Sequence, residues 1–200
     1  MVRKYTNYQL ESIMARNEQI LWRGKPNRNC FILEAIFNSF LPFALIWFLI
    51  DSSILFAVST EPDAMKVFLP FILIHLAPVW IYLFGVVLAV LKYKKTEYIV
   101  TEKGIYVSGG AISYTENAIG YKHISDVRIN RGFFDQRIGV GDIQIITNKR
   151  PPNSTVVLKN GVIQRYTGYD ICDVCEFQSV YNLIRENITK IKETSVSNKF

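Results

Sequence analysis

The chain has 200 residues, half of them hydrophobic and 14% aromatic, and its mean hydropathy is +0.15. Only 20% of the residues are charged, which is low for a water-soluble domain. The net charge is +6, but after position 95 thirteen basic residues face eleven acidic ones, so this part offers no basic surface for nucleic acid.

Residues 1–29 form a polar segment that we place in the cytoplasm. Its apolar side chains between Leu10 and Leu21 fall mostly at spacings of three and four residues, which is typical of an amphipathic helix. Such a helix could lie along the membrane surface, or the segment could dock on the soluble domain. The spacing does not distinguish these alternatives.

Two apolar runs, residues 30–50 and 67–91, define a candidate hairpin over residues 30–92. A helix rises about 1.5 Å per residue, so each run can cross the roughly 30 Å hydrocarbon core of a bilayer. A cleaved signal peptide fits the first run poorly, because signal segments are shorter and lie closer to the N-terminus. We therefore predict two transmembrane helices.

The charges that flank these runs predict their orientation. The connecting loop, residues 51–66, carries three acidic residues and one lysine, whereas basic residues lie at both outer ends. By the positive-inside rule, both termini are cytoplasmic, and the chain is a multi-pass protein of the inner (cell) membrane. The basic residues expected to contact anionic headgroups are Arg23, Lys25, Arg28, Lys92, Lys94 and Lys95.

Three polar side chains, Glu34, Asn38 and His75, interrupt the apolar runs. Polar groups inside a bilayer are costly and are often functional. By our count Asn38 and His75 lie at similar depth, so we predict a hydrogen bond between them. This bond could simply join the two helices, or the three residues could form an ion or proton path in an oligomer.

From residue 93 to residue 192 we predict a cytoplasmic domain of about seven antiparallel strands. The apolar period changes to two, and strand-like runs cover residues 98–100, 105–107, 111–114, 124–129, 143–147, 155–159 and 162–166. Asn160-Gly161 is a strong hairpin dipeptide, and residues 139–142, with two glycines, are interpreted as a tight turn between strands. This succession predicts a roll or barrel.

An amphipathic helix ends this domain and would close one end of the roll. Asp173 and Glu176 suggest a capping-box start, which places Cys172 just ahead of the helix and Cys175 within it. Residues 193–200 are expected to form a polar tail. The apolar stripe consists of Phe177, Val180, Tyr181, Ile184, Ile188 and Ile191.

The chain lacks the residue groupings that catalysis or metal binding requires. His75 and His123 are its only histidines, and the CxxC of Cys172 and Cys175 has no second ligand pair. His123 follows Lys122 at a strand start and is expected on the surface, and no nucleophile motif is present. We therefore predict no enzyme activity, no cofactor and no metal site.

The order of two spans, strands and one helix resembles the bacterial PH-domain family of membrane proteins, in particular its YdbS-like group. The resemblance is carried by residues 18–26, 98–101, 104–105, 124–127 and 133–143. It implies a fold of about seven strands rolled against a C-terminal helix, and no agreed enzyme activity. Phosphoinositide-binding PH domains carry a basic cluster between their first two strands, whereas residues 101–104 here contain Lys103 alone, so specific inositide binding is not expected.

These features predict a membrane-anchored interaction module that acts as a scaffold or accessory subunit in a larger membrane assembly. Its expected partners are anionic lipid headgroups and other membrane or cytoplasmic proteins, including further copies of itself. The alternative is a homo-oligomeric channel or transport component that uses Glu34, Asn38 and His75.

Overall fold

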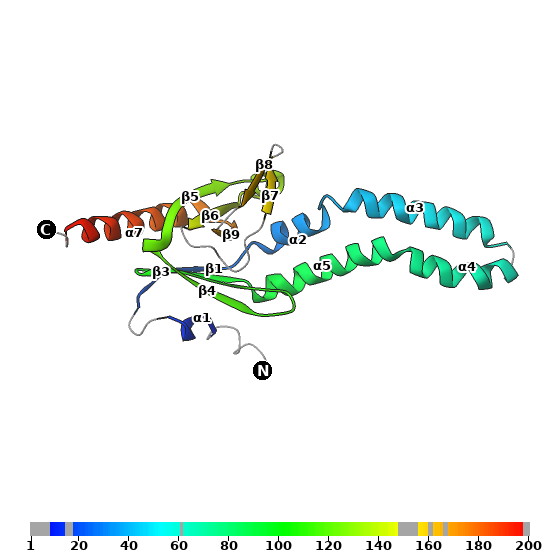
Figure 1. Cartoon of the computed structure of the whole chain (residues 1–200), viewed down its shortest axis with the longest axis horizontal. Helices are drawn as coiled ribbons and strands as arrows, with labels where there is room; N and C mark the ends of the chain where they lie inside the picture. Colours follow the sequence, from blue (N-terminus) through cyan, green and yellow to red (C-terminus); the bar gives the residue numbers. More distant parts are fainter. Residues whose placement is uncertain are drawn as a thin grey trace. The chain divides into compact units, whose positions relative to one another are not determined.

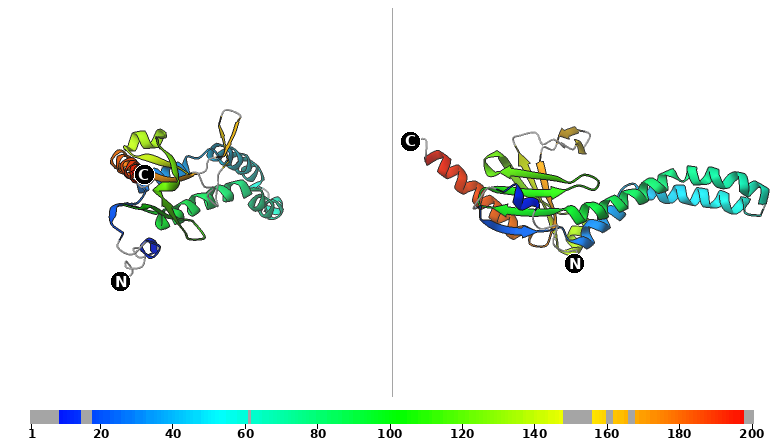
Figure 2. Two further views of the ribbon diagram at one scale, coloured as in Figure 1. Left: turned by 60° about the vertical axis from the view of Figure 1, so that its left-hand side comes forward. Right: turned by 90° about the horizontal axis from the view of Figure 1, so that it is seen from below.

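A computed structural model describes residues 9–14, 18–60, 62–147, 156–159, 162–165 and 168–197 (Figures 1 and 2). The chain divides into two compact units. Ile32–Leu91 form a helical unit, here called the hairpin unit, and Met1–Phe31 with Lys92–Phe200 form a second unit, here called the β unit. The hairpin unit is therefore an insertion in the sequence of the β unit, and residues 1–29 are part of the β unit rather than a separate segment.

The first sheet of the β unit has the order β1-β2-β3-β4, with β1 at Ile20–Gly24, β2 at Glu97–Thr101, β3 at Gly104–Gly109 and β4 at Thr115–Gly120. All three pairs are antiparallel. Gly24 pairs with Tyr98, so the chain leaves β1 and returns to β2 at the same end of the sheet. A hairpin over residues 97–109 was predicted, but β4 was placed too early, because its residues are mostly polar.

The prediction of an amphipathic helix in the N-terminal segment is wrong for residues 20–24. These residues form strand β1 and dock on the β-rich domain, which was the predicted alternative. Ile20, Leu21 and Trp22 favour a strand when a partner edge is present, and β2 provides that edge. The preceding helix α1 is only four residues long, Gln9–Ser12. Leu10 in α1 is buried against Ile99 and Tyr106.

The second sheet has the order β5-β6-β9, with β5 at Ile124–Asn130, β6 at Gly141–Thr147 and β9 at Gly168–Val174. A 3-10 turn, η1 at Tyr121–His123, precedes β5, and helix α6 at Phe133–Ile138 connects β5 to β6. The two sheets together contain seven antiparallel strands. About seven were predicted, but β1 and β9 were not among the predicted strands. The strands β7 (Val156–Lys159) and β8 (Val162–Arg165) form a separate pair, and the predicted Asn160-Gly161 turn lies outside the described residues.

Two local predictions in this region are wrong. Residues 139–142 are not a turn between strands: Gly139, with φ of 84°, ends helix α6 in the left-handed conformation, which glycine adopts without strain. Asp173 does not begin the C-terminal helix, because it lies in β9 at an irregularity of the β6–β9 register and has φ of 56°. Cys175 lies in an exposed turn, and Cys172 is in the strand.

Helix α7, Phe177–Ser197, packs on β5, β6 and η1 and closes the core of the β unit. The predicted stripe is correct, since Phe177, Val180 and Ile184 are buried and its other members pack on them. The helix continues to Ser197, five residues beyond the predicted end of the domain. The core also takes side chains from both sheets: Tyr98, Val100, Ile105, Ile119, Tyr121, Ile124, Val127, Ile143, Ile145, Ile171 and Val174.

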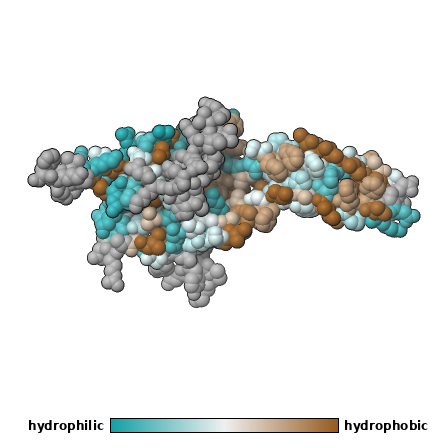
Figure 3. All heavy atoms as spheres, in the orientation of Figure 1, coloured by the Kyte–Doolittle hydropathy of each residue, from teal (hydrophilic) through white to brown (hydrophobic). Residues whose placement is uncertain are grey.

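The hairpin unit contains α2 (Arg28–Ile36), α3 (Leu41–Val58), α4 (Pro62–His75) and α5 (Ala77–Lys95), of which α2 begins and α5 ends in the β unit. Two of these helices, Leu41–Val58 and Ala77–Lys95, are long and apolar enough to cross a membrane. Their surfaces carry many hydrophobic residues (Figure 3).

The predicted span boundaries differ from these helices. The first run breaks over residues 37–40, and α3 then continues through Asp51 to Val58, because the residues after Asp51 are again mostly apolar. The second run breaks at Leu76, two residues before Pro78, whose ring supplies no backbone N–H. The predicted loop of residues 51–66 is therefore reduced to a short connection around residue 60.

Candidate functional site

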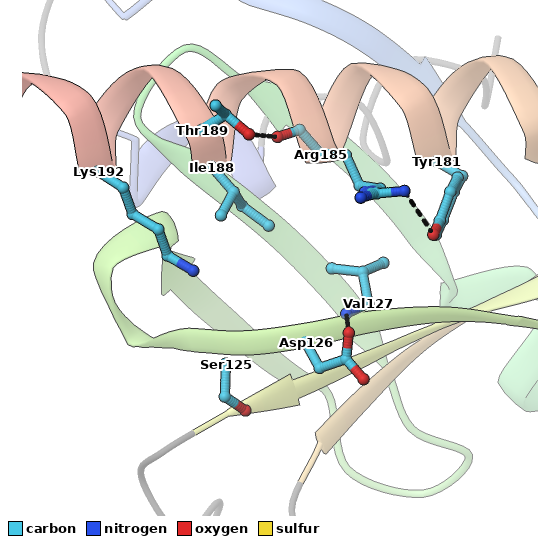
Figure 4. A pocket seen from close by; sticks show the side chains of 8 residues that line it. All are labelled: Ser125, Asp126, Val127, Tyr181, Arg185, Ile188, Thr189 and Lys192. Carbon is cyan, nitrogen blue, oxygen red and sulfur yellow. Dashed lines mark hydrogen bonds between the residues drawn. The ribbon is translucent and has the colours of Figure 1, made fainter.

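A groove lies between strand β5 and helix α7 in the β unit (Figure 4). Within the described residues β5 is an edge strand, paired with β6 on one side only. Its other edge therefore has backbone N–H and C=O groups that can accept a further strand. The groove has a volume of about 290 Å³ and is lined by Ser125, Asp126, Val127, Tyr181, Arg185, Ile188, Thr189 and Lys192.

The two elements form the groove because each has one apolar side. Val127 of β5 is buried in the core, whereas Ser125 and Asp126 are exposed. On α7, Ile188 packs against the core, while Arg185 is exposed, one turn before Thr189. The core contacts thus fix the strand and the helix, and polar side chains line the space between them.

The charges of the side chains that line the groove do not sum to zero, because Arg185 and Lys192 outnumber Asp126. Arg128 Nε donates a hydrogen bond of 2.8 Å to Asp126 Oδ2, and this bond holds the pKa of the Asp126 carboxyl below its usual value. The Arg185 guanidinium lies 5.7 Å from the centroid of the Tyr181 ring and donates to its hydroxyl at 3.4 Å. With Asp126 already paired, Arg185 and Lys192 give the helix side of the groove a positive character.

A second polar cluster lies inside the β unit and joins α2, α6 and β9. The Cys30 thiol donates to Asp135 Oδ1 at 3.2 Å, and Asp135 Oδ2 accepts the Gly132 N–H at 2.7 Å. Cys30, Asp135 and Asp173 are all buried, and their donor atoms lie within 4.8 Å of one another. These hydrogen bonds give the cluster a structural role as a joint between three elements.

Asp142 lies beside this joint. Its Oδ1 accepts the backbone N–H of Asp173 at 2.9 Å, which helps to hold Asp173 in its left-handed conformation. Burial raises the pKa of Asp142 to about 6, and the neighbouring Asp135 and Asp170 act in the same direction. Sequence reasoning missed this group because the contacts are made between β6 and β9, which are more than twenty residues apart in the sequence.

The six predicted lipid-contacting residues have different surroundings. Arg23 is held by two carboxylates, Glu97 at 2.6 Å and Glu11 at 2.7 Å. Lys95 Nζ donates to the carbonyls of Ala111 and Ile112 at 3.0 and 3.3 Å. Lys92 lies 5.8 Å from the ring centroid of Phe31. The remaining three, Lys25, Arg28 and Lys94, are exposed.

In the hairpin unit, the predicted bond between Asn38 and His75 does not form. Asn38 instead caps the end of α2, donating to Ala35 O at 2.7 Å and accepting from Phe40 N at 2.8 Å. The partner of His75 Nδ1 is Asp51 Oδ1 at 2.7 Å. Asp51 was assigned to the loop from the sequence, and its contact with His75 was therefore missed. The third predicted intramembrane residue, Glu34, is exposed on α2.

Two tryptophan side chains donate hydrogen bonds to backbone carbonyl groups at the break between α4 and α5. The N–H of Val79 bonds to Leu76 O instead of continuing the regular helix pattern. Trp80 Nε1 donates to Leu73 O at 3.1 Å, and Trp47 Nε1 donates to His75 O at 2.8 Å. The two indoles thus supply donors to carbonyls at the break, where Pro78 has none to give.

Comparison with known proteins assigns a family to this fold. The family model described as "Bacterial PH domain" matches residues 53–188, about two thirds of the chain, from within α3 to the second half of α7. No curated protein and no solved structure matches the chain.

Proposed function

Because this chain belongs to the bacterial PH domain family, we propose that it is a membrane-anchored interaction module, serving as a scaffold or accessory subunit of a membrane protein assembly. The hairpin unit is the anchor, and the groove between β5 and α7 binds the partner. The observation that carries the proposal is that β5, among the described strands, pairs along one edge only and lies beside a positively charged groove.

The β1–β2 pairing supports the anchored topology. The hairpin unit enters the sequence between these strands, and Gly24 of β1 pairs with Tyr98 of β2. Two neighbouring strands must lie on the same side of a membrane, so both ends of the hairpin lie on that side as well. The positive flanks of the hairpin support a cytoplasmic location for this side.

Native and introduced thiols test this topology in intact cells. Cys175 is exposed in the β unit, and Ser59 is exposed at the end of α3. A membrane-impermeant maleimide should label Ser59→Cys from outside, whereas Cys175 should react only after lysis. A Cys175→Ser background isolates the Ser59→Cys signal, and labelling of Cys175 in intact cells would exclude the proposed orientation.

The groove supports binding of an extended segment by strand addition. An incoming strand pairs its backbone with the edge of β5 and directs alternate side chains toward α7. Arg185 and Lys192 would then favour acidic side chains in the partner. A PH-like domain needs no catalytic group for such a role.

Charge reversal tests the groove against a matched site on the same helix. Arg185→Glu with Lys192→Glu changes the groove, whereas Lys190→Glu changes an exposed residue that pairs with Glu186 outside it. Chemical crosslinking in native membranes, followed by quantitative mass spectrometry, should show partners lost from the groove variant and kept by the Lys190→Glu control. Equal recovery from the two variants would exclude the groove as the binding surface.

A further inference from the structure

The β unit has a face at which the chain leaves for the hairpin unit and returns from it. Phe31 is the last residue before the insertion and Lys92 the first after it. These two positions are neighbours, since Lys92 Nζ lies 5.8 Å from the Phe31 ring and the Tyr93 ring centroid lies 6.0 Å from that of Phe31. We call the surface around these residues the exit face, because the chain leaves the β unit and re-enters it there.

The loop between β3 and β4 displays an apolar side chain at this face. Lys95, the last residue of α5, donates to the carbonyls of Ala111 and Ile112 and so fixes the loop beside the returning helix. Gly110 has φ of 120°, and a Cβ there would lie 2.0 Å from Ser113 O, so the turn is tight. The Ile112 side chain is 80% exposed.

Helix α6 displays a second apolar side chain beside the outgoing helix. The bond between Cys30 and Asp135 joins α6 to the start of α2, one residue before Phe31. Phe133, in the first turn of α6, is 69% exposed. The Arg137 guanidinium lies 5.7 Å from its ring centroid, which places a cation beside the exposed aromatic ring.

Exposed cations lie close in sequence to the contacts that hold these two apolar side chains. Lys92 and Lys94 precede the contact made by Lys95, and Lys25 and Arg28 precede Cys30 in the sequence; all four are exposed. Arg137 adds a fifth exposed cation next to Phe133. Apolar side chains with basic residues next to them are suited to an anionic bilayer surface, where the side chain enters the acyl boundary and the cations meet headgroups.

We infer that Ile112 and Phe133 insert into the headgroup region of an anionic phospholipid bilayer, one beside each helix that leaves the exit face. This inference rests on the proposed anchoring and adds a second membrane contact made by the β unit itself. The combined contacts would restrict the tilt of the β unit on the bilayer and present the β5 edge in a constant direction.

Tryptophan substitutions test the inference in proteoliposomes containing anionic phospholipid. Ile112→Trp and Phe133→Trp each add a fluorophore at the proposed contacts, and Lys103→Trp adds one in the exposed turn at the opposite end of β3. The emission of the parent is subtracted from each variant. Lipids brominated near the headgroup should quench the added emission of the first two variants and leave that of Lys103→Trp unchanged.

The native tryptophans of the hairpin unit distinguish a failure of the membrane anchoring from a failure of the inference about Ile112 and Phe133. Trp47 and Trp80 report insertion of the hairpin, because bromolipids should quench the parent as well. If the parent is quenched and the added emission of either Ile112→Trp or Phe133→Trp is not, the inference is overturned while the anchoring stands. If the parent is not quenched, the anchoring itself fails and this inference falls with it.

Discussion

Each unit of this chain contains a joint, and the polar groups of the two joints are satisfied in different ways. At the joint around Asp135 and Asp142 in the β unit, backbone N–H groups donate: Asp135 accepts from Gly132, and Asp142 accepts from Asp173 in the irregular part of β9. At the helix breaks of the hairpin unit, side chains donate to backbone carbonyls. Trp47 and Trp80 donate at the break between α4 and α5, and Tyr82 donates to Ile36 O at 2.8 Å where α2 ends.

This difference follows from the surroundings of each backbone. Loops and strand irregularities in the β unit leave spare amides close to the carboxylates. A helix in an apolar environment uses nearly all of its amides internally, so a break must be satisfied by side chains from the neighbouring helix. The same contrast predicts where each unit is most sensitive to substitution.

The largest effect is expected from Asp135→Ala in the β unit. The substitution removes the acceptor of the Gly132 N–H and the partner of the Cys30 thiol, both in the interior, and should lower the free energy of unfolding by about 3 kcal/mol. Urea unfolding of the detergent-solubilised protein measures this. Asp126→Ala, which removes a half-exposed carboxylate paired with Arg128, should change it by less than about 1 kcal/mol.

His75→Leu should have the next largest effect, and it tests the hairpin unit. Asp51 Oδ1 loses its 2.7 Å partner, and the other carboxylate oxygen already lacks a hydrogen bond. Removing one member of such a pair leaves a polar group uncompensated, so local opening of α4 should become easier by about 2 kcal/mol, measured by hydrogen exchange in nanodiscs.

The double variant Asp51→Leu/His75→Leu sharpens this test. Replacing both partners with apolar residues removes the uncompensated group, so the double variant should be more stable than His75→Leu alone. Additive losses from the two substitutions would mean that the pair does not act as a unit.

Much of the fold was predictable from local patterns. The alternation of residues 98–107, 124–129 and 143–147 and the stripe of α7 each depend on the residues of one element, and each was assigned correctly. Strands β1 and β9 were missed because their pairing partners lie far away in the sequence: β1 pairs across the whole inserted hairpin. Such pairing is decided by the tertiary structure rather than by local propensity.

The candidate site was less predictable than the fold. The groove needs β5 and α7, whose lining residues are more than fifty positions apart, and no local pattern joins Asp126 to Arg185. The partner of His75 was misassigned because the span was ended at Asp51, a charged residue that the helix in fact contains. A charged residue need not end a helix when a histidine on the neighbouring helix forms a hydrogen bond with it.

Trp47→Phe tests the donor role of the indoles, with a smaller expected effect. The ring shape is largely kept, but the 2.8 Å bond to His75 O is lost, and the opening free energy of the α4–α5 break should fall by about 1.5 kcal/mol in hydrogen exchange. Trp22→Phe is the control in the β unit, since the Trp22 indole donates to an exposed Glu176 at 3.3 Å. An equal loss in both variants would contradict the difference drawn between the units.

The smallest effect, and the one with a pH signature, is expected from Asp142→Asn. The pKa of Asp142 is raised from 3.8 to about 6, so the folded chain binds this proton more tightly than the unfolded chain. Stability from this group is therefore present below pH 4 and lost as the pH rises through 6.

Asparagine at position 142 keeps an acceptor for the Asp173 N–H but carries no charge. The variant should match the parent near pH 4 and exceed it by about 1 kcal/mol at pH 8, allowing for partial exposure of the carboxyl. Urea unfolding across this range measures the difference, and a gap between variant and parent that does not change with pH would show that burial of the charge is not its cause.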